Sequence, residues 1–310
     1  MRRHISPNLF RYFLPVMKAL FRFFLCLAAF MNYGAKAGAQ VRMTYAIDRP
    51  AFLITHMETD KFSVVDSSLA EIAYKYRFRM TADDDSLSAD DDMWLLIGKR
   101  YVSFFSINLR NLDDKNTESM RTTLKMDSPQ ITWQGYDIMR DMKENMLTVN
   151  HRVPFTQDVC QYIESVPNIQ WTLLPDDRDT IMGYHCQAAE GEFGGRKWKV
   201  WYTDLIPVPL GPWKLGGLKG LILKAVDSGR NFMFEAEGLA QKRLPVKQFD
   251  WKYKKMTKDE WKKFETYMYN NAGKFVKNNN IRLFIPKSGG ERGLQPVSES
   301  WQEYYNPLEK

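Results

Sequence analysis

Hydrophobic and polar residues alternate along much of the chain. In the clearest run, residues 72–80, apolar or aromatic side chains alternate with three cations. A period of two is typical of a strand with one face in the core and the other in water. The same alternation, or a short apolar run, predicts further strands at 41–47, 93–97, 99–107, 146–153, 181–188, 198–203, 220–226 and 232–237. Glycines and prolines separate these runs, so we expect a mainly β fold: a curved antiparallel sheet or a partly open barrel.

One segment near the end has a helical period instead. Thr257 and Glu260 have the spacing of a capping box. Beyond them, hydrophobic residues recur along one helical face, at Trp261, Phe264, Met268, Ala272 and Phe275. We therefore expect a C-terminal amphipathic helix over 257–275 that packs on the sheet. Residues 158–165 predict a second, shorter helix or turn.

The first 39 residues have the composition of a signal peptide. A basic start precedes a short apolar run at 23–31, and Ala37, Gly38 and Ala39 form a cleavage site. A membrane-spanning helix needs about 20 apolar residues, so an uncleaved anchor is the weaker alternative. We expect export, cleavage near Ala39 and Gln40, and a final location in the periplasm or at the outer membrane. Residues 40–310 are then expected to form a single β-rich domain.

Charge gives no reason to expect a nucleic-acid partner. Six of the 44 Lys and Arg residues lie in the predicted leader, which leaves 38 against 37 acids in the rest of the chain. Two local clusters remain: residues 241–290 are rich in cations, and six aspartates crowd the stretch from Asp83 to Asp92. We expect both to be solvated surface. Contact with anionic lipid headgroups is the alternative for the first cluster, and a weak calcium site for the second.

Residues suited to catalysis are few beyond the leader. The histidines are His56, His151 and His185, and no motif typical of hydrolases, zinc sites or thiol redox centres is present. Cys186 follows His185 directly, and neighbours on a strand point to opposite faces, so they cannot act as nucleophile and base. We expect no enzyme, no cofactor and no metal. Cys160 and Cys186 either form a disulfide in an oxidising compartment or are ordinary core thiols.

The densest glycine segment, residues 211–222, runs into a strand, whereas a phosphate-binding loop opens a helix. Its glycines indicate positive φ angles or close backbone packing in a tight connection. The functional alternative is a loop that shapes the mouth of an apolar cavity lined by Trp201 and Trp213.

This segment belongs to a longer block, residues 183–222, which reads GYHCQAAEGEFGGRKWKVWYTDLIPVPLGPWKLGGLKGLI. The block resembles the hallmark sequence of the GLPGLI family of exported proteins from Gram-negative bacteria, with Lys219 where the family name has proline. Weaker matches extend to the stretch Tyr305-Asn306-Pro307-Leu308-Glu309. The resemblance implies export and a β-rich domain, and it implies no catalytic residues. Within the block we expect ligand-binding or structural roles for Arg196, Trp201, Tyr202, Pro207, Gly211, Pro212, Trp213, Lys214, Gly216, Gly217 and Gly220.

Aromatic residues make up 14% of the chain and include nine tryptophans, while titratable residues suited to catalysis are scarce. We therefore expect a non-enzymatic periplasmic binding or carrier protein for a lipid, an acyl chain or an extended peptide. The alternative is an accessory or scaffold protein that docks an outer-membrane receptor or secretion complex. A hydrolase with an unrecognised site is the third hypothesis.

Overall fold

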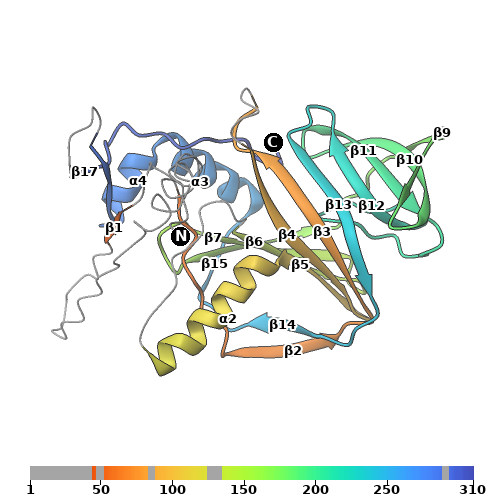
Figure 1. Cartoon of the computed structure of the whole chain (residues 1–310), viewed down its shortest axis with the longest axis horizontal. Helices are drawn as coiled ribbons and strands as arrows, with labels where there is room; N and C mark the ends of the chain where they lie inside the picture. The colour runs from red at the N-terminus through yellow and green to blue at the C-terminus, as the bar shows by residue number, and fades with distance from the viewer. Residues whose placement is uncertain (1–43, 47–51, 83–87, 124–134, 288–292) are drawn as a thin grey trace, which may run out of the picture. The chain divides into compact units, whose positions relative to one another are not determined.

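The computed structural model describes residues 44–46, 52–82, 88–123, 135–287 and 293–310 (Figure 1). The predicted signal peptide therefore lies outside the described residues. The chain forms two compact units. The first consists of the chain up to Ala51 together with Ala272–Trp301, and the second consists of Phe52–Asn271 together with Gln302–Lys310.

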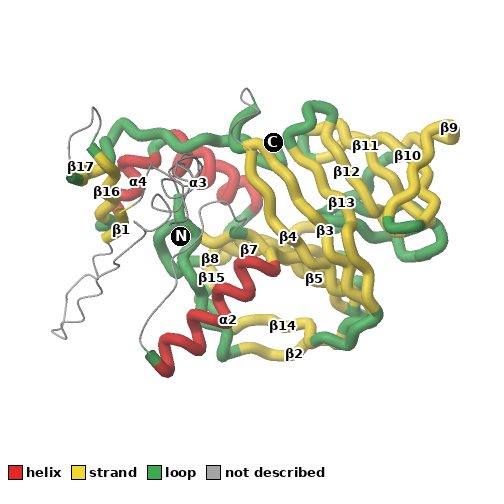
Figure 2. Tube along the Cα trace, in the orientation of Figure 1, coloured by secondary structure: helices red, strands yellow, loops and turns green. Residues whose placement is uncertain are grey.

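A sheet of 12 strands dominates the second unit (Figure 2). All its neighbouring strands are antiparallel except the first pair, β15 and β8, which is parallel. In spatial order the strands are β15 (Tyr253–Lys255), β8 (Val159–Ser165), β7 (Met146–Arg152), β6 (Tyr136–Asp141), β5 (Tyr101–Ser106), β4 (Ser88–Ile97), β3 (Ala70–Arg79), β13 (Phe232–Ala240), β12 (Leu221–Asp227), β11 (Arg196–Thr203), β10 (Tyr184–Phe193) and β9 (Thr172–Ile181).

The mainly β fold is confirmed, but the predicted curled sheet or partly open barrel is wrong. The sheet is open and mixed, and it neither closes nor curls. Its two edges explain why closure fails. β15 has only three residues. β9 contains Pro175, which has no backbone N–H to donate, and the register of β9 against β10 shifts along the pair. Both are devices that stop an edge strand from pairing further.

Two helices and a small sheet complete the second unit. α2 (Ile107–Thr122) packs against β4 and β5, with Ser106 as its N-cap. β2 (Phe62–Ser67) pairs with β14 (Pro245–Phe249). α3 (Lys258–Asn270) begins at the predicted capping box of Thr257 and packs against β8, as expected. The short helix predicted at 158–165 is wrong, because these residues form β8 and pair with β7 along their whole length.

The described residues of the first unit form four short elements. β1 (Thr44–Ala46) pairs in parallel with β16 (Arg282–Pro286), which pairs in the antiparallel sense with β17 (Leu294–Pro296). α4 (Ala272–Asn278) takes up the end of the predicted 257–275 helix, which breaks at Asn271. The predicted helix is therefore two helices, and neither is C-terminal, since β16 and β17 follow. Within the described residues, no helix has the length and hydrophobicity needed to cross a bilayer.

The interior of the second unit is filled by interlocking aromatic rings. Tyr76 of β3 stacks on Phe234 of β13, with ring centroids 4.3 Å apart. Trp198 of β11 contacts both Phe234 and Trp213, which lies in the loop between β11 and β12. The cavity between this loop and strands β4 to β7 has a volume of only about 20 Å³. That is room for a water molecule, not for an organic ligand.

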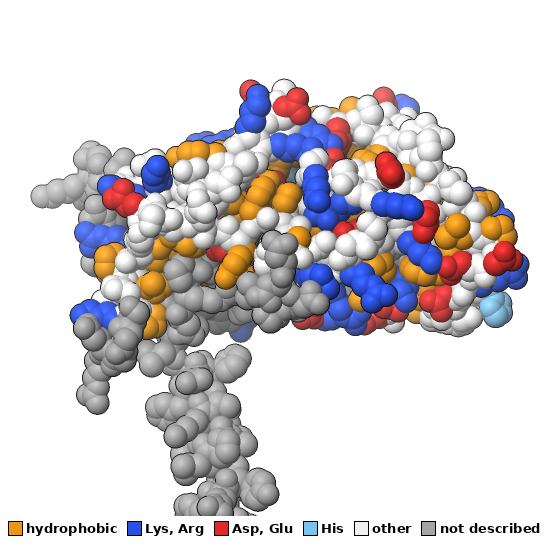
Figure 3. All heavy atoms as spheres, turned by 90° about the horizontal axis from the view of Figure 1, so that it is seen from above, with side chains coloured by type: hydrophobic (Ala, Val, Ile, Leu, Met, Phe, Trp, Pro, Cys, Tyr) orange, Lys and Arg blue, Asp and Glu red, His pale blue; other side chains and the backbone are white. Residues whose placement is uncertain are grey.

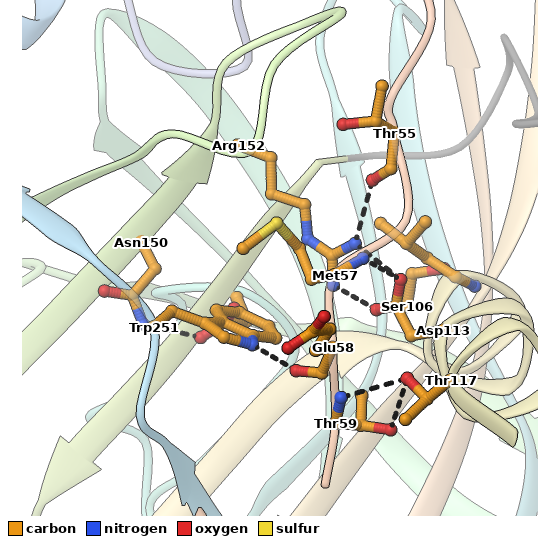
Figure 4. A network of polar contacts seen from close by, with 12 residues as sticks. Thr55, Met57, Glu58, Thr59, Ser106, Asp113, Thr117, Asn150, Arg152 and Trp251 are labelled. Carbon is orange, nitrogen blue, oxygen red and sulfur yellow. Dashed lines mark hydrogen bonds and ion pairs between the residues drawn. The ribbon is translucent and has the colours of Figure 1, made fainter. Parts of the chain in front are cut away.

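A polar network lies beneath α2, on the other face of the sheet (Figure 4). The Asp113 carboxylate accepts hydrogen bonds from the Arg152 guanidinium and from the backbone N–H of Met57. Their side chains are buried, with 0% of Asp113 and 6% of Arg152 exposed. The Arg152 guanidinium also lies 5.0 Å from the Trp251 ring. This network connects α2 to Arg152 of β7 and to Met57.

Candidate functional site

The structure buries most of the predicted residues of the glycine-rich loop. Gly211, Pro212, Trp213, Lys214 and Gly216 are buried, and the loop closes through a bridge between Leu210 and Gly216. Backbone demands account for the glycines, as the first alternative expected. At Gly220 a Cβ atom would lie 2.0 Å from the Thr203 carbonyl oxygen, and Gly217 has a φ of +89°. Both positions therefore exclude or disfavour a side chain.

The predicted pair of cavity-lining tryptophans is not brought together. Even-numbered residues of β11 face the interior, where Trp198 and Tyr202 are buried and Trp213 packs against Trp198. Trp201 is an odd-numbered residue of the same strand and is only half-buried. Because neighbouring residues of a strand point to opposite faces, Trp201 and Trp213 lie on opposite sides of the sheet. Pro207 is exposed.

A groove of about 830 Å³ is lined by residues of β3, β4, β10, β11, β12 and β13 and of the turn after β12, and its lining includes both Trp201 and Trp198. We call it the charged groove. Its lining includes two acids, Glu190 and Asp227. It also includes six cations: Arg77, Arg79, Lys197, Lys199, Lys224 and Arg230. The face of the molecule shown in Figure 3 likewise has Lys and Arg side chains gathered among hydrophobic ones.

Strand register explains why these cations meet. Met233 of β13 lies opposite Arg77 of β3 on one side and opposite Val226 of β12 on the other. Val226 in turn lies opposite Lys199 of β11. Cross-strand neighbours share one face of the sheet, so this row has an apolar floor with a cation at each end. A ligand with an apolar face and negatively charged ends matches that row.

The adjacent row places an aromatic ring between two ammonium groups. Trp201 lies opposite Lys224, and the Nζ atoms of Lys199 and Lys224 are 5.2 and 5.3 Å from the centre of its ring. Both separations are within cation–π range. The Trp201 Nε1 donates to Asp177 Oδ1 at 3.2 Å, which fixes the indole. Lys199 also pairs with Asp177, and its hydrogen bond lowers the pKa of that carboxyl.

Several of the groove cations are only loosely paired. Lys224 Nζ is 3.6 Å from an Asp179 oxygen and 3.5 Å from a Glu235 oxygen. The Arg77 guanidinium is 3.6 Å from Glu235. Direct charged hydrogen bonds are shorter, at about 2.7–2.9 Å. Lys224 and Arg77 therefore retain donors for an anionic ligand.

Among the described residues, the histidines and cysteines form no catalytic pair. His185 is exposed and Cys186 is buried, which confirms that they point to opposite faces. His151 is stacked between Trp261 and Tyr162, and burial, with a smaller contribution from Lys214, lowers its pKa to about 3. It is thus a neutral core residue. Burial also lowers the pKa of His56.

Cys160 and Cys186 are free, buried thiols, so no disulfide joins them. They lie in β8 and β10, which are on opposite halves of the sheet. Burial raises the pKa of each thiol to about 11, which keeps both protonated and unreactive near neutral pH.

The acidic stretch is partly described. Asp83, Asp84 and Asp85 lie outside the described residues. Asp91 is buried in β4 and accepts hydrogen bonds from Ser106 and Asn108, and its two neighbours in the strand, Asp90 and Asp92, pair with Lys75. In the part of the chain that the structure describes, no group of three His, Cys, Asp or Glu side chains is placed to hold a metal ion.

Comparison with known proteins adds little to this geometry. No model of a known protein family matches the chain, and no curated protein matches its sequence. Two structures of PNGF-II resemble it. The one in space group P21 has a TM-score of 0.44 and 16% identity over 64% of this chain and 33% of that chain, and the one in space group C2 has 0.46 and 14% over 73% and 35%. The chain therefore spans about a third of PNGF-II, and this likeness does not bear on its activity. The GLPGLI resemblance stays a prediction.

Proposed function

We propose that the protein is a non-enzymatic binding protein of the cell envelope, whose charged groove holds an extended anionic ligand such as the acidic sugar headgroup of an envelope lipid. The observation that carries this proposal is the Trp201 indole flanked by Lys199 and Lys224. Both ammonium groups lie within cation–π range of this indole, which holds them close together, and ammonium groups bind phosphate or carboxylate. Export and membership of the GLPGLI family belong to the proposal and rest on the sequence.

The size of the groove favours it over the interior as the ligand site. Ligand pockets usually have volumes of about 300–1,000 Å³, and the groove falls within this range at about 830 Å³. The cavity under the glycine-rich loop, at about 20 Å³, is too small for an acyl chain. A carrier for a lipid would therefore bind the headgroup here and leave the acyl chains outside the protein.

The same lining favours binding over catalysis. The described lining includes no histidine or cysteine. Its two carboxylates are already engaged: Glu190 pairs with Lys197 at 3.1 Å, and Asp227 pairs with Arg196 at 3.0 Å. A general acid or base needs a free proton site aimed at the substrate, and neither carboxylate offers one.

Flotation with lipid vesicles tests the proposal. We expect the protein to bind phosphatidylcholine vesicles that contain lipopolysaccharide and not vesicles of phosphatidylcholine alone. Replacing Lys199 and Lys224 together by glutamine should weaken binding at least about tenfold, which corresponds to about 1.4 kcal/mol. Trp201→Ala should weaken it by a similar factor. Added salt should also weaken binding, because the contacts are ionic.

A matched control removes the same charge elsewhere. Lys143 and Lys263 are exposed and lie outside the groove lining, so replacing both by glutamine should leave binding within about twofold of the unmodified protein. If the groove variant and this control lose affinity equally, attraction to the whole surface explains binding and the groove is not the site.

A further inference from the structure

Residues 305–310 belong to the second unit and have no regular secondary structure, with a bend at Leu308. We call them the 305–310 segment. Their side chains are half-buried except for Lys310, which is exposed. The hydrogen bonds that hold the segment reach residues far earlier in the chain, on β3, β11, α3 and the loops around them. A folded surface that holds a short irregular segment through such distant contacts is arranged like a peptide-binding site.

Arg196 is the first anchor of the segment. Its side chain is 3% exposed, and it donates to the backbone oxygens of Pro307 and Leu308 at 2.6 and 3.1 Å. It also donates to the Asn306 side-chain oxygen at 2.9 Å. An ion pair with Asp227 at 3.0 Å and the Phe232 ring, 4.4 Å away, fix the guanidinium in place. The Arg196 guanidinium, already held in place, thus binds two backbone oxygens and one side chain of the segment.

Asn306 is recognised from both ends of its amide. Its oxygen accepts from Arg196, and its nitrogen donates to the Arg79 backbone oxygen at 3.0 Å and to Asn231 Oδ1 at 3.3 Å. Aspartate would lose the donor and leucine would lose both functions. The site is therefore specific for an amide of this length at this position.

Glu309 is the second anchor. Its carboxylate pairs with Lys214 at 2.5 Å and with Lys258, and both lysines also pair with Glu164. The Lys214 side chain is 1% exposed. Burial alone would raise the pKa of Glu309, but the two lysines outweigh it and the net pKa is lowered. Without Glu309, two partly or fully buried cations would share one carboxylate, which is costly.

Two glycines of the β10–β11 turn complete the contact. Lys310 donates its backbone N–H to the Gly194 oxygen at 2.8 Å. A Cβ atom on Gly195 would lie 2.8 Å from the Lys310 Cβ atom, and both glycines have positive φ angles. Gly194 therefore supplies a backbone hydrogen-bond partner for the segment, and the missing side chain of Gly195 leaves room for Lys310.

We propose that Arg196, Asn231, Lys214 and Lys258 form a peptide-binding site specific for an Asn-Pro-Leu-Glu sequence, and that the chain's own 305–310 segment occupies it. The same peptide would bind there in trans when the contacts of this segment are weakened. The site adjoins the charged groove, whose lining includes Asn231, but the proposal does not require a ligand in that groove. It assigns to two of the predicted hallmark residues, Arg196 and Lys214, the role of holding a peptide. Linkage in the same chain raises the effective concentration of the segment, so the intramolecular form predominates in the unmodified protein.

The test uses the full chain and a labelled peptide with the sequence of residues 303–310. In the variant Asn306→Ala with Glu309→Gln, the chain's own segment loses the side-chain contacts of residues 306 and 309. Fluorescence anisotropy should then show the peptide binding to this variant. Binding to the unmodified chain should be at least about tenfold weaker, because the site is filled. Adding Arg196→Gln to the variant should also weaken binding at least about tenfold. A peptide carrying the Ala and Gln replacements is the control and should not bind.

Failure of the peptide to bind the folded variant would overturn the proposal, and so would equal binding with and without Arg196→Gln. If the variant does not fold, hydrogen exchange in the unmodified chain replaces it. The Lys310 amide should exchange slowly, and excess free peptide should speed its exchange by displacing the segment. A Lys310 amide that exchanges freely, or whose protection excess peptide leaves unchanged, also overturns the proposal. Peptide binding is measured by anisotropy or hydrogen exchange and ligand binding by flotation with vesicles, so the two proposals fail separately.

Discussion

Replacing Asp113 by alanine tests whether the polar network beneath α2 holds that helix in place. The Asp113 carboxylate accepts from both terminal nitrogens of Arg152 and from the Met57 backbone N–H at 2.8 Å. With 0% of the Asp113 side chain and 6% of the Arg152 side chain exposed, water cannot take over these contacts. The substitution therefore leaves a buried cation and a buried backbone donor without their acceptor.

The expected loss follows from these groups. Removing one partner of a buried ion pair costs about 3–5 kcal/mol, because the remaining charge stays out of water. Arg152 keeps a weak contact at 3.5 Å with the Thr55 oxygen and its place over the Trp251 ring, which offset part of this cost. We therefore expect Asp113→Ala to lower the free energy of unfolding by about 3 kcal/mol. That is a large part of the 5–15 kcal/mol typical of a whole domain.

Urea denaturation followed by circular dichroism measures this loss. The same helix supplies the control: Arg121 pairs with Asp60 at 2.8 Å, but 55% of its side chain is exposed. Arg121→Ala should cost no more than about 1 kcal/mol. Replacing Asp113 by leucine and Arg152 by methionine together should cost less than Asp113→Ala alone, since no charge is left buried. Equal losses for Asp113→Ala and Arg121→Ala would show that the pair is not buried as described.

Two further predictions concern the second unit. Burial raises the pKa of Glu265 to about 7, and the hydrogen bond from Tyr305 opposes this with a smaller effect. The folded state therefore keeps a proton on Glu265 that the unfolded state releases near pH 4.5. Stability should fall as pH rises from about 4.5 to 7, by up to about 3 kcal/mol, and thermal melting of Glu265→Gln over this range should show a flatter dependence. Gly220→Ala should lower the melting temperature by several degrees, because its Cβ atom would lie 2.0 Å from the Thr203 oxygen. Gly238→Ala, whose Cβ atom would have its nearest contact at 3.6 Å, should change the melting temperature little. Equal shifts for the two variants would contradict the close approach at Gly220.

Strands with one buried face were predictable because hydrophobic residues alternate with polar ones along them. Residues 70–79 alternate between core and solvent as the sequence indicated, and Leu221, Ile222 and Leu223 are buried on both faces of β12. α2 was missed because its buried face includes Asp113, Asn116 and Thr117, which give no hydrophobic period. β9 was missed for the opposite reason, since an edge strand with three aspartates and a proline is almost wholly exposed.

The candidate site was predictable only in part. The glycine-rich block stood out because close packing restricts which residues it can contain, and it includes Arg196 and Lys214. Lys199, Lys224 and Arg77 were visible only as polar positions of separate strands. What brings them together is the pairing of β3 with β13, strands more than 150 positions apart in the sequence. No local pattern encodes that pairing, and contacts of this range are the least accessible to sequence reasoning.

The two faces of β11 separate the two proposals. Arg196 belongs with the even-numbered residues that face the interior, where it holds the 305–310 segment, while Lys199 and Trp201 belong with the odd-numbered residues that face the groove. Asp227 links them, because it pairs with Arg196 and also lines the groove. If the segment leaves its site, Arg196 loses three acceptors and the Asp227 end of the groove loses its fixed neighbour. Arg79 and Asn231 also contact Asn306 and line the groove. Peptide displacement should therefore change ligand affinity while Lys199 and Trp201 continue to bind the ligand, and an affinity that stays the same would show that the two sites are not coupled.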